Sequence, residues 1–200
     1  MATQKVVVEE SDISASQLQD LFRQFADGSL NKAHLQAFLE HRNPWAPITE
    51  VTLGVYKTAR AYWSALRHMP CNIGTLYLFP GGISLAQEKV KLSLAYVSVA
   101  DLGFKKKTPY KDICKAAQQR GYKLCPAEVG LALRLACKNQ REGEWFAIGM
   151  EPDPDYGYIY SLGCEAPSYS DDCLEYILSI CSTKETPDLK PDHELVFVKP

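Results

Sequence analysis

The stretch that decides the fold is Val90-Lys91-Leu92-Ser93-Leu94-Ala95-Tyr96-Val97-Ser98-Val99-Ala100. In its first half, apolar and polar residues alternate, which is the period of a β-strand with one buried face. The apolar phase then shifts to Val97 and Val99, which predicts either a bulge or burial on both faces. The stretch therefore predicts a central strand, and the elements around it set the fold class.

Two helices are predicted after this strand. Thr108 is placed to cap the first helix, with Pro109 in its first turn, and Gly121 ends it. The second helix is predicted to begin around Pro126, with Glu128 in the first turn, where a carboxylate meets the positive end of the helix dipole. The apolar residues that follow cover more than one side, so we expect this helix to be largely buried.

The rest of the chain predicts strands. Trp145–Met150 and Tyr156–Leu162 read as a hairpin around a turn rich in Pro and Asp. Leu195–Val198 reads as a closing strand. Residues 174–181 have helical spacing, but their β-branched content leaves a strand open. Residues 70–200 are therefore predicted to form an α+β domain of two helices and a mainly antiparallel sheet.

The N-terminal segment, residues 1–68, is predicted to be helical. Leu18, Leu21, Phe22 and Phe25 fall on one face of a helix over residues 14–26. Gly28 suits the end of that helix, Ser29 suits the start of the next, and Asn43-Pro44 ends the second. The two would form a helical hairpin, followed by a linker over residues 43–54 and a third helix over residues 55–68.

Short helices are marginal in water by themselves. We therefore expect the hairpin to pack on the α+β domain or on a second chain. Trp45, beside His41 and Arg42, follows the hairpin where Pro44 and Pro47 stiffen the chain, and is the candidate anchor for a protein partner or a homo-oligomer.

Composition limits the functional classes. The 200 residues are 46% hydrophobic and 23% charged, which is ordinary for a globular protein. No stretch approaches the roughly 20 apolar residues of a membrane span, and the start lacks the features of a signal peptide. We expect a cytoplasmic protein with no membrane partner, whose seven cysteines are reduced.

Charge is distributed unevenly along the chain. Residues 105–141 hold ten Lys and Arg against two Asp and Glu, whereas residues 151–194 hold two Lys against eleven acidic residues. The basic block could bind nucleic acid through its phosphates, although a solvated surface is favoured. Its candidate contact residues are Lys105, Lys106, Lys107, Lys111 and Lys115.

Cys125 is the candidate nucleophile, because it precedes a predicted helix whose dipole would lower its pKa. A catalytic thiol also needs a base, and no histidine stands in a recognisable motif with it. A structural cysteine is therefore favoured over a cysteine-dependent enzyme.

The predicted hairpin carries a candidate ligand site. Tyr156, Tyr158 and Tyr160 alternate along one strand, and a row of exposed rings could stack on sugars or bases. Glu151 and Asp153 precede the tyrosines, and their carboxylates could contribute to the same site. A simple acidic turn is the favoured interpretation of this loop. No cysteine pair, histidine motif or glycine-rich loop predicts a metal or a cofactor.

Four phrases carry a resemblance: residues 34–44, residues 97–104, residues 124–130 and Gly143-Glu144-Trp145. Together they resemble a family of uncharacterised proteins common in candidate-phylum bacteria, from about residue 14 to the C-terminus. The resemblance implies no activity. Residues 113–128 also resemble the two-helix segment of C-type-lectin-like and sulfatase-modifying domains, which implies a similar fold and no particular chemistry.

The sequence thus predicts a non-catalytic module that binds a protein or a small ligand. A nucleic-acid-associated protein using residues 105–141 is the first alternative, and an enzyme acting through Cys125 is the second.

Overall fold

The computed structural model describes residues 15–39, 47–69, 83–138, 140–165, 175–183 and 188–200. The elements in chain order are α1 (Ala15–Ala26), α2 (Lys32–Leu39), β1 (Glu50–Leu53), α3 (Ala59–Arg67), β2 (Val90–Ser98), α4 (Tyr110–Gln119), α5 (Glu128–Ala136), β3 (Trp145–Ile148), β4 (Tyr158–Glu165), β5 (Glu175–Ser182) and β6 (Glu194–Val198). The predicted α+β class is confirmed.

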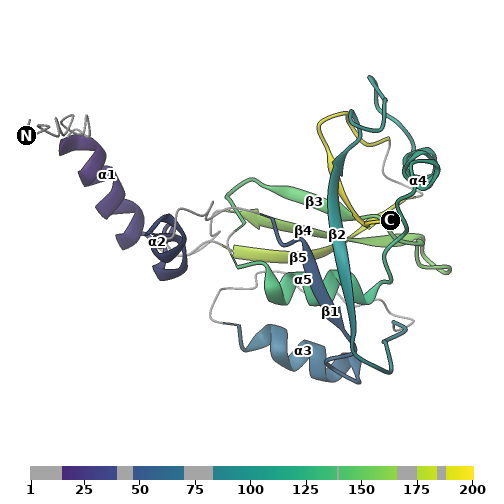
Figure 1. Ribbon diagram of the computed structural model, residues 1–200, viewed down its shortest axis with the longest axis horizontal. Coiled ribbons are helices and arrows are strands. Elements are labelled where there is room, and N and C mark those ends of the chain that lie inside the picture. Colours follow the sequence, from purple (N-terminus) through teal and green to yellow (C-terminus); the bar gives the residue numbers. More distant parts are fainter. Residues whose placement is uncertain (1–14, 40–46, 70–82, 139, 166–174, 184–187) are drawn as a thin grey trace, which may run out of the picture.

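The strands form one sheet in the order β1-β2-β6-β3-β4-β5. All neighbouring pairs are antiparallel except β3 and β6, which are parallel, so the sheet is mainly antiparallel as predicted. Helix α5 packs against both end strands, β1 and β5, and also against β4 and α3. The sheet therefore curls around α5, with α3 on the outer side of α5 and α4 at another part of the sheet (Figure 1).

The shift of phase in β2 has a specific origin. Its first four residues pair with β1, and the pairing with β6 begins at Leu94. Val90 is 44% exposed, while Leu94 and Val99 are fully buried. The strand thus changes partner midway, and its second half enters the core.

Close packing of α5 on the sheet explains a glycine in the middle of that helix. A Cβ on Gly130 would lie 2.7 Å from the ring of Tyr160 in β4. Glycine costs stability inside a helix, so its presence here is compensated by the close approach of helix and strand.

Several local predictions need correction. Residues 43–54, predicted as a linker, contain β1, and β1 with α3 belongs to the α+β body. Residues 175–182 form β5, paired along their length with β4, so of the two structures that the sequence left open here the strand is the one present. Thr108 does not cap α4: Pro109 is the N-cap residue, and the Thr108 hydroxyl donates to the carbonyl of Lys106.

Both N-terminal helices are present where the sequence predicted helices. In Figure 1 they lie to one side of the sheet, away from the α+β body, which is formed by the described residues from 47 onward. That they pack against each other as a hairpin remains a prediction.

Candidate functional site

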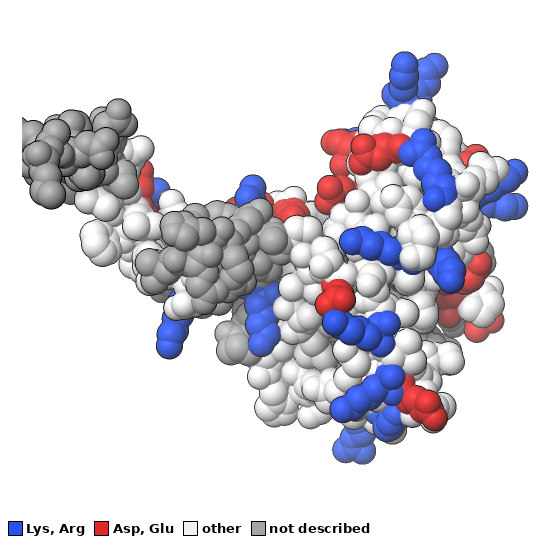
Figure 2. Space-filling view, in the orientation of Figure 1, with Lys and Arg blue, Asp and Glu red and all other residues white. Residues whose placement is uncertain are grey.

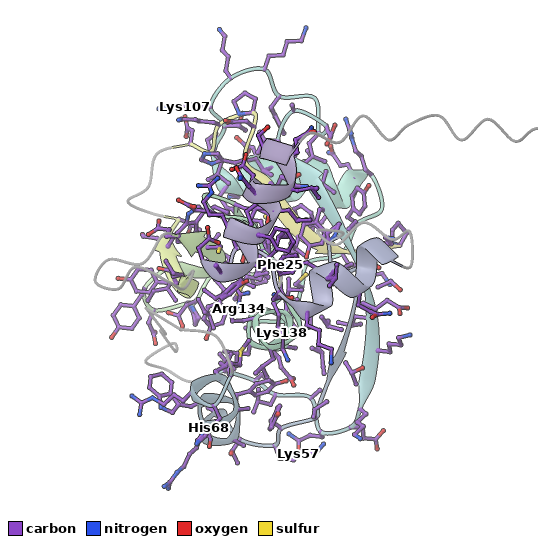
Figure 3. All side chains as sticks on the ribbon, turned by 90° about the vertical axis from the view of Figure 1, so that its left-hand side faces the viewer. Phe25, Lys57, His68, Lys107, Arg134 and Lys138 are labelled. Atoms are coloured by element: carbon purple, nitrogen blue, oxygen red, sulfur yellow. The ribbon has the colours of Figure 1, made fainter. Side chains whose placement is uncertain are left out.

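The candidate functional site is the apolar face of α1. Leu18 is 45% exposed, Leu21 is 37% exposed and Phe22 is 69% exposed. Phe25 is half-buried and lies near the junction with α2 (Figure 3). We call these four residues the α1 face. The core cluster among the described residues begins only at Ile48, so the α1 face is no part of it.

The opposite side of α1 carries the charge of this helix. Arg23 donates to the Asp20 carboxylate at 3.0 Å, three residues back, and both side chains are largely exposed. An exposed ion pair of this kind adds little stability. Its effect here is on charge: the two ions neutralise each other, and both point away from the α1 face.

The turn between α1 and α2 is built from short polar side chains. The Asp27 carboxylate accepts hydrogen bonds from the backbone N–H of Ser29 at 3.0 Å and from its hydroxyl, and these lower the pKa of Asp27. Ser29 was predicted to cap α2, but Asn31 does so, accepting from the N–H of His34. Leu30 is 3% exposed beside this turn.

His34 completes the cap. Its Nδ1 atom accepts from the backbone N–H of Asn31 at 3.2 Å, which requires an unprotonated Nδ1. Burial lowers the pKa of His34, so the neutral ring that this hydrogen bond needs is also the favoured form. The turn is therefore well defined next to a helix that exposes its apolar side chains.

Cys125 is placed unfavourably for nucleophilic chemistry. It is 4% exposed, and its thiol donates to the carbonyl of Val196 at 3.4 Å. Burial, with a smaller effect from Cys114, raises the pKa of Cys125 to about 12. Helix α5 begins only at Glu128, so the helix end expected to stabilise a thiolate lies three residues further on.

The three tyrosines of the predicted ligand site are not equivalent. Tyr160 is fully buried beneath α5. Tyr156 is 49% exposed and stacks on half-buried Tyr158, with ring centroids 5.7 Å apart and planes 8° from parallel. The structure thus brings two of the three rings together, and only Tyr156 has a widely open face.

The acidic residues beside these rings have different positions. Glu151 is exposed, whereas Asp153 is buried and accepts from the backbone N–H groups of Asp155 and Tyr156. Asp153 therefore shapes the turn between β3 and β4. Within the described ranges, no group of three or more His, Cys, Asp or Glu side chains could hold a metal ion.

The five candidate lysines are all exposed. Lys105, Lys106 and Lys107 lie in the loop before α4, and Lys111 and Lys115 lie on α4. Lys and Arg side chains on the face shown in Figure 2 are interspersed with Asp and Glu, so that face has no continuous basic surface. Lys107 lies at the opposite end of the molecule from Lys57 and His68 (Figure 3).

The predicted anchor Trp45, with His41 and Arg42, lies outside the described residues. Part of the acidic segment over residues 151–194, including Asp171 and Asp172, lies outside them as well. These parts of the sequence prediction stay predictions.

Sequence reasoning missed the role of Glu128. Its carboxylate is 1% exposed and accepts three hydrogen bonds: from Gly54 N–H at 2.7 Å, Tyr62 hydroxyl at 2.7 Å and Ala86 N–H at 2.6 Å. It ties α5 to the end of β1, to α3 and to the segment before β2. This role is structural, because each oxygen already has a partner within the protein.

Arg134, on the same helix, is also fully buried (Figure 3). Its guanidinium donates to the Gln140 side chain at 2.8 Å and to the carbonyl of Cys137, and it lies 4.8 Å from the ring centroid of Tyr176. The sequence signal for both groups was a charged residue within an otherwise apolar helix. Their burial and partners assign them to the core.

A small hollow lies beside Tyr110, next to the end of β5 and to Asp188 and Leu189. Its volume of about 20 Å³ holds about one water molecule. It is lined by Tyr110, Ile159, Cys181, Ser182, Thr183, Asp188 and Leu189. This hollow is too small for a substrate.

Comparisons with known proteins supply no further guide. No family model, no curated protein and no solved structure matches the chain. The predicted likeness to C-type-lectin-like domains therefore stays a prediction. No helix in the described part of the chain is both long and apolar enough to cross a membrane.

Proposed function

We propose that this chain is a non-catalytic protein-binding module, and that the α1 face is its docking surface. The observation that carries the proposal is the exposure of Phe22, at 69%, with Leu18 and Leu21 on the same helix face. Apolar side chains grouped on one face of an amphipathic helix are a common means of docking on another protein.

The surroundings of the candidate nucleophile and of the candidate lysines favour a binding role over catalysis. The thiol of Cys125 is buried and its pKa is raised, which disfavours the thiolate that a cysteine-dependent enzyme requires. On the face seen in Figure 2, Lys and Arg side chains are interspersed with carboxylates, which does not favour the nucleic-acid alternative. The five described cysteines are free, which agrees with the proposed cytoplasmic location.

A position-specific photocrosslink tests this proposal. Benzoyl-phenylalanine replaces Phe22 in one version of the full chain and Ser16, on the opposite side of α1, in the other. Illumination in an extract of the native cells should give protein adducts from position 22 and few from position 16. Equal labelling from the two positions, or none from position 22, would refute a docking role for the α1 face.

A further inference from the structure

We propose that the partner of the α1 face is the α1 face of a second copy of this chain, packed antiparallel about a two-fold axis between Leu21 and Phe22. The inference rests on the proposed function, because it needs the α1 face to be a docking surface. A two-fold interface uses the same patch on both copies, so the patch must be complementary to itself. The order of residues along α1 meets this requirement.

The side chains of the α1 face are complementary in size when two copies pack antiparallel. In an antiparallel pair centred between Leu21 and Phe22, residues at equal distances from the centre lie opposite each other. Leu21 of one copy then meets Phe22 of the other, and Leu18 meets Phe25. Every such contact joins one leucine and one aromatic ring, so no position brings two large or two small side chains together. Leucine and aromatic side chains matched in this way fill the space between helices evenly.

The borders of the α1 face carry no charge. Successive residues of a helix are about 100° apart, which places Gln17 and Gln24 along one border of the α1 face and Gln19 and Ala26 beyond the other. All four are uncharged. A two-fold pair brings identical borders of the two helices together, so charged borders would repel each other. The uncharged borders of α1 avoid this repulsion.

The same distribution disfavours other kinds of partner. Helices that bind acidic membranes or nucleic acids place Lys and Arg beside the apolar face. The one basic residue of α1, Arg23, lies on the opposite side and is paired with Asp20 at 3.0 Å. A neutral helix from a second protein copy fits this surface better than a polyanion.

The oligomeric state of the full chain tests the inference. By sedimentation equilibrium from low micromolar to several hundred micromolar, the wild-type mass should rise from 22.4 kDa towards twice that value. Phe22→Glu should remain monomeric over the whole range, and its fold should be kept because Phe22 is largely exposed. Ser16→Glu adds the same charge on the opposite side of α1 and should associate as the wild type does.

Two double variants test the antiparallel arrangement. Gln17 and Gln24 lie on the same border, and an antiparallel pair brings Gln17 of one copy near Gln24 of the other. Gln17→Glu with Gln24→Glu should weaken self-association by about tenfold, since like charges then oppose each other. Gln17→Glu with Gln24→Lys should restore it. Equal affinities of these two double variants would overturn the antiparallel arrangement.

The two proposals fail in different ways. A wild-type mass that stays at 22.4 kDa at every concentration overturns the pairing of two copies. If position 22 still gives adducts with another protein in the extract, the docking function stands and only the identity of the partner is wrong. A constant mass together with no adducts from position 22 overturns both proposals.

Discussion

Helices α3 and α1 are both short and amphipathic, but the apolar face of α3 is buried and that of α1 is exposed. Leu66 of α3 is fully buried against the body, whereas Phe22 of α1 is 69% exposed. Tyr62 of α3 is also held by a hydrogen bond to Glu128, a residue far along the chain. An apolar stripe in the sequence thus predicts a helix and its apolar face, but it does not predict which surface packs against that face. This contrast is the reason for our proposal that α1 docks on another molecule.

The largest expected difference between the two regions is in thiol reactivity. In Phe22→Cys, the new thiol on α1 should react quickly with iodoacetamide at pH 8, and native Cys125 should react slowly. The pKa of Cys125, raised to about 12, lowers its thiolate fraction on the order of a thousandfold, and burial blocks access as well. Mass spectrometry of the labelled peptides measures both rates in one sample. Comparable rates at the two positions would contradict a closed body.

The next difference is in stability. Phe146→Ala removes a ring that is 4% exposed and packs edge-on against Tyr96 in the body, so it should lower the free energy of unfolding by about 3–5 kcal/mol. Phe22→Ala should change it by less than about 0.5 kcal/mol in the monomer. Urea unfolding at low protein concentration gives both values. A large loss for Phe22→Ala would mean that α1 belongs to the core.

A smaller effect concerns the carboxylate inside the body. In Glu128→Gln, an amide NH₂ group replaces one of the two carboxylate oxygens. That NH₂ group then faces either the N–H of Ala86 or the donors of Gly54 and Tyr62, so two hydrogen-bond donors point at each other. The expected loss of unfolding free energy is about 1–3 kcal/mol. Glu142→Gln, on the surface, is the matched control and should have little effect. If both variants were equally stable, the hydrogen bonds of Glu128 would not be holding the elements together.

The smallest effect concerns the turn beside α1. Burial lowers the folded-state pKa of His34, so the unfolded chain takes up a proton more readily. The contribution of His34 to stability is therefore complete above about pH 6.5 and is lost as the pH falls through the folded pKa. An NMR titration of the His34 ring should give a pKa below about 6.5. A value above that would show that the ring is protonated in the folded protein, against its role as an acceptor from Asn31.

The sequence predicted the elements with strong local signals. Strand β2, the hairpin of β3 and β4, the closing strand β6 and the end of α4 at Gly121 all follow from periodicity and turn residues. Strand β1 was missed because it has only four residues and lies after two prolines, so its pairing with β2 has no local signal. The helical spacing and the β-branched residues near residues 174–181 left helix and strand open, and the pairing with β4 shows that residues 175–182 form a strand.

The candidate site was predictable only in part. The spacing of Leu18, Leu21 and Phe22 predicts their common face, but their exposure depends on where the rest of the chain lies. The buried contacts of Glu128 were likewise not predictable from local sequence. Its partners Gly54 and Tyr62 are 74 and 66 residues away, so a local sequence pattern could suggest only the helix end as its partner.

The central claim is that the body folds without help from the α1 face, and that this face associates with a second copy. The most direct test is the urea unfolding midpoint of the full chain at a low and a high protein concentration. A species that binds only to the folded state raises the midpoint as its concentration rises. We predict that the wild-type midpoint rises with concentration, and that Phe22→Glu removes this rise without lowering the midpoint at low concentration. A wild-type midpoint independent of concentration, or a Phe22→Glu midpoint already lowered in the dilute protein, would contradict the account.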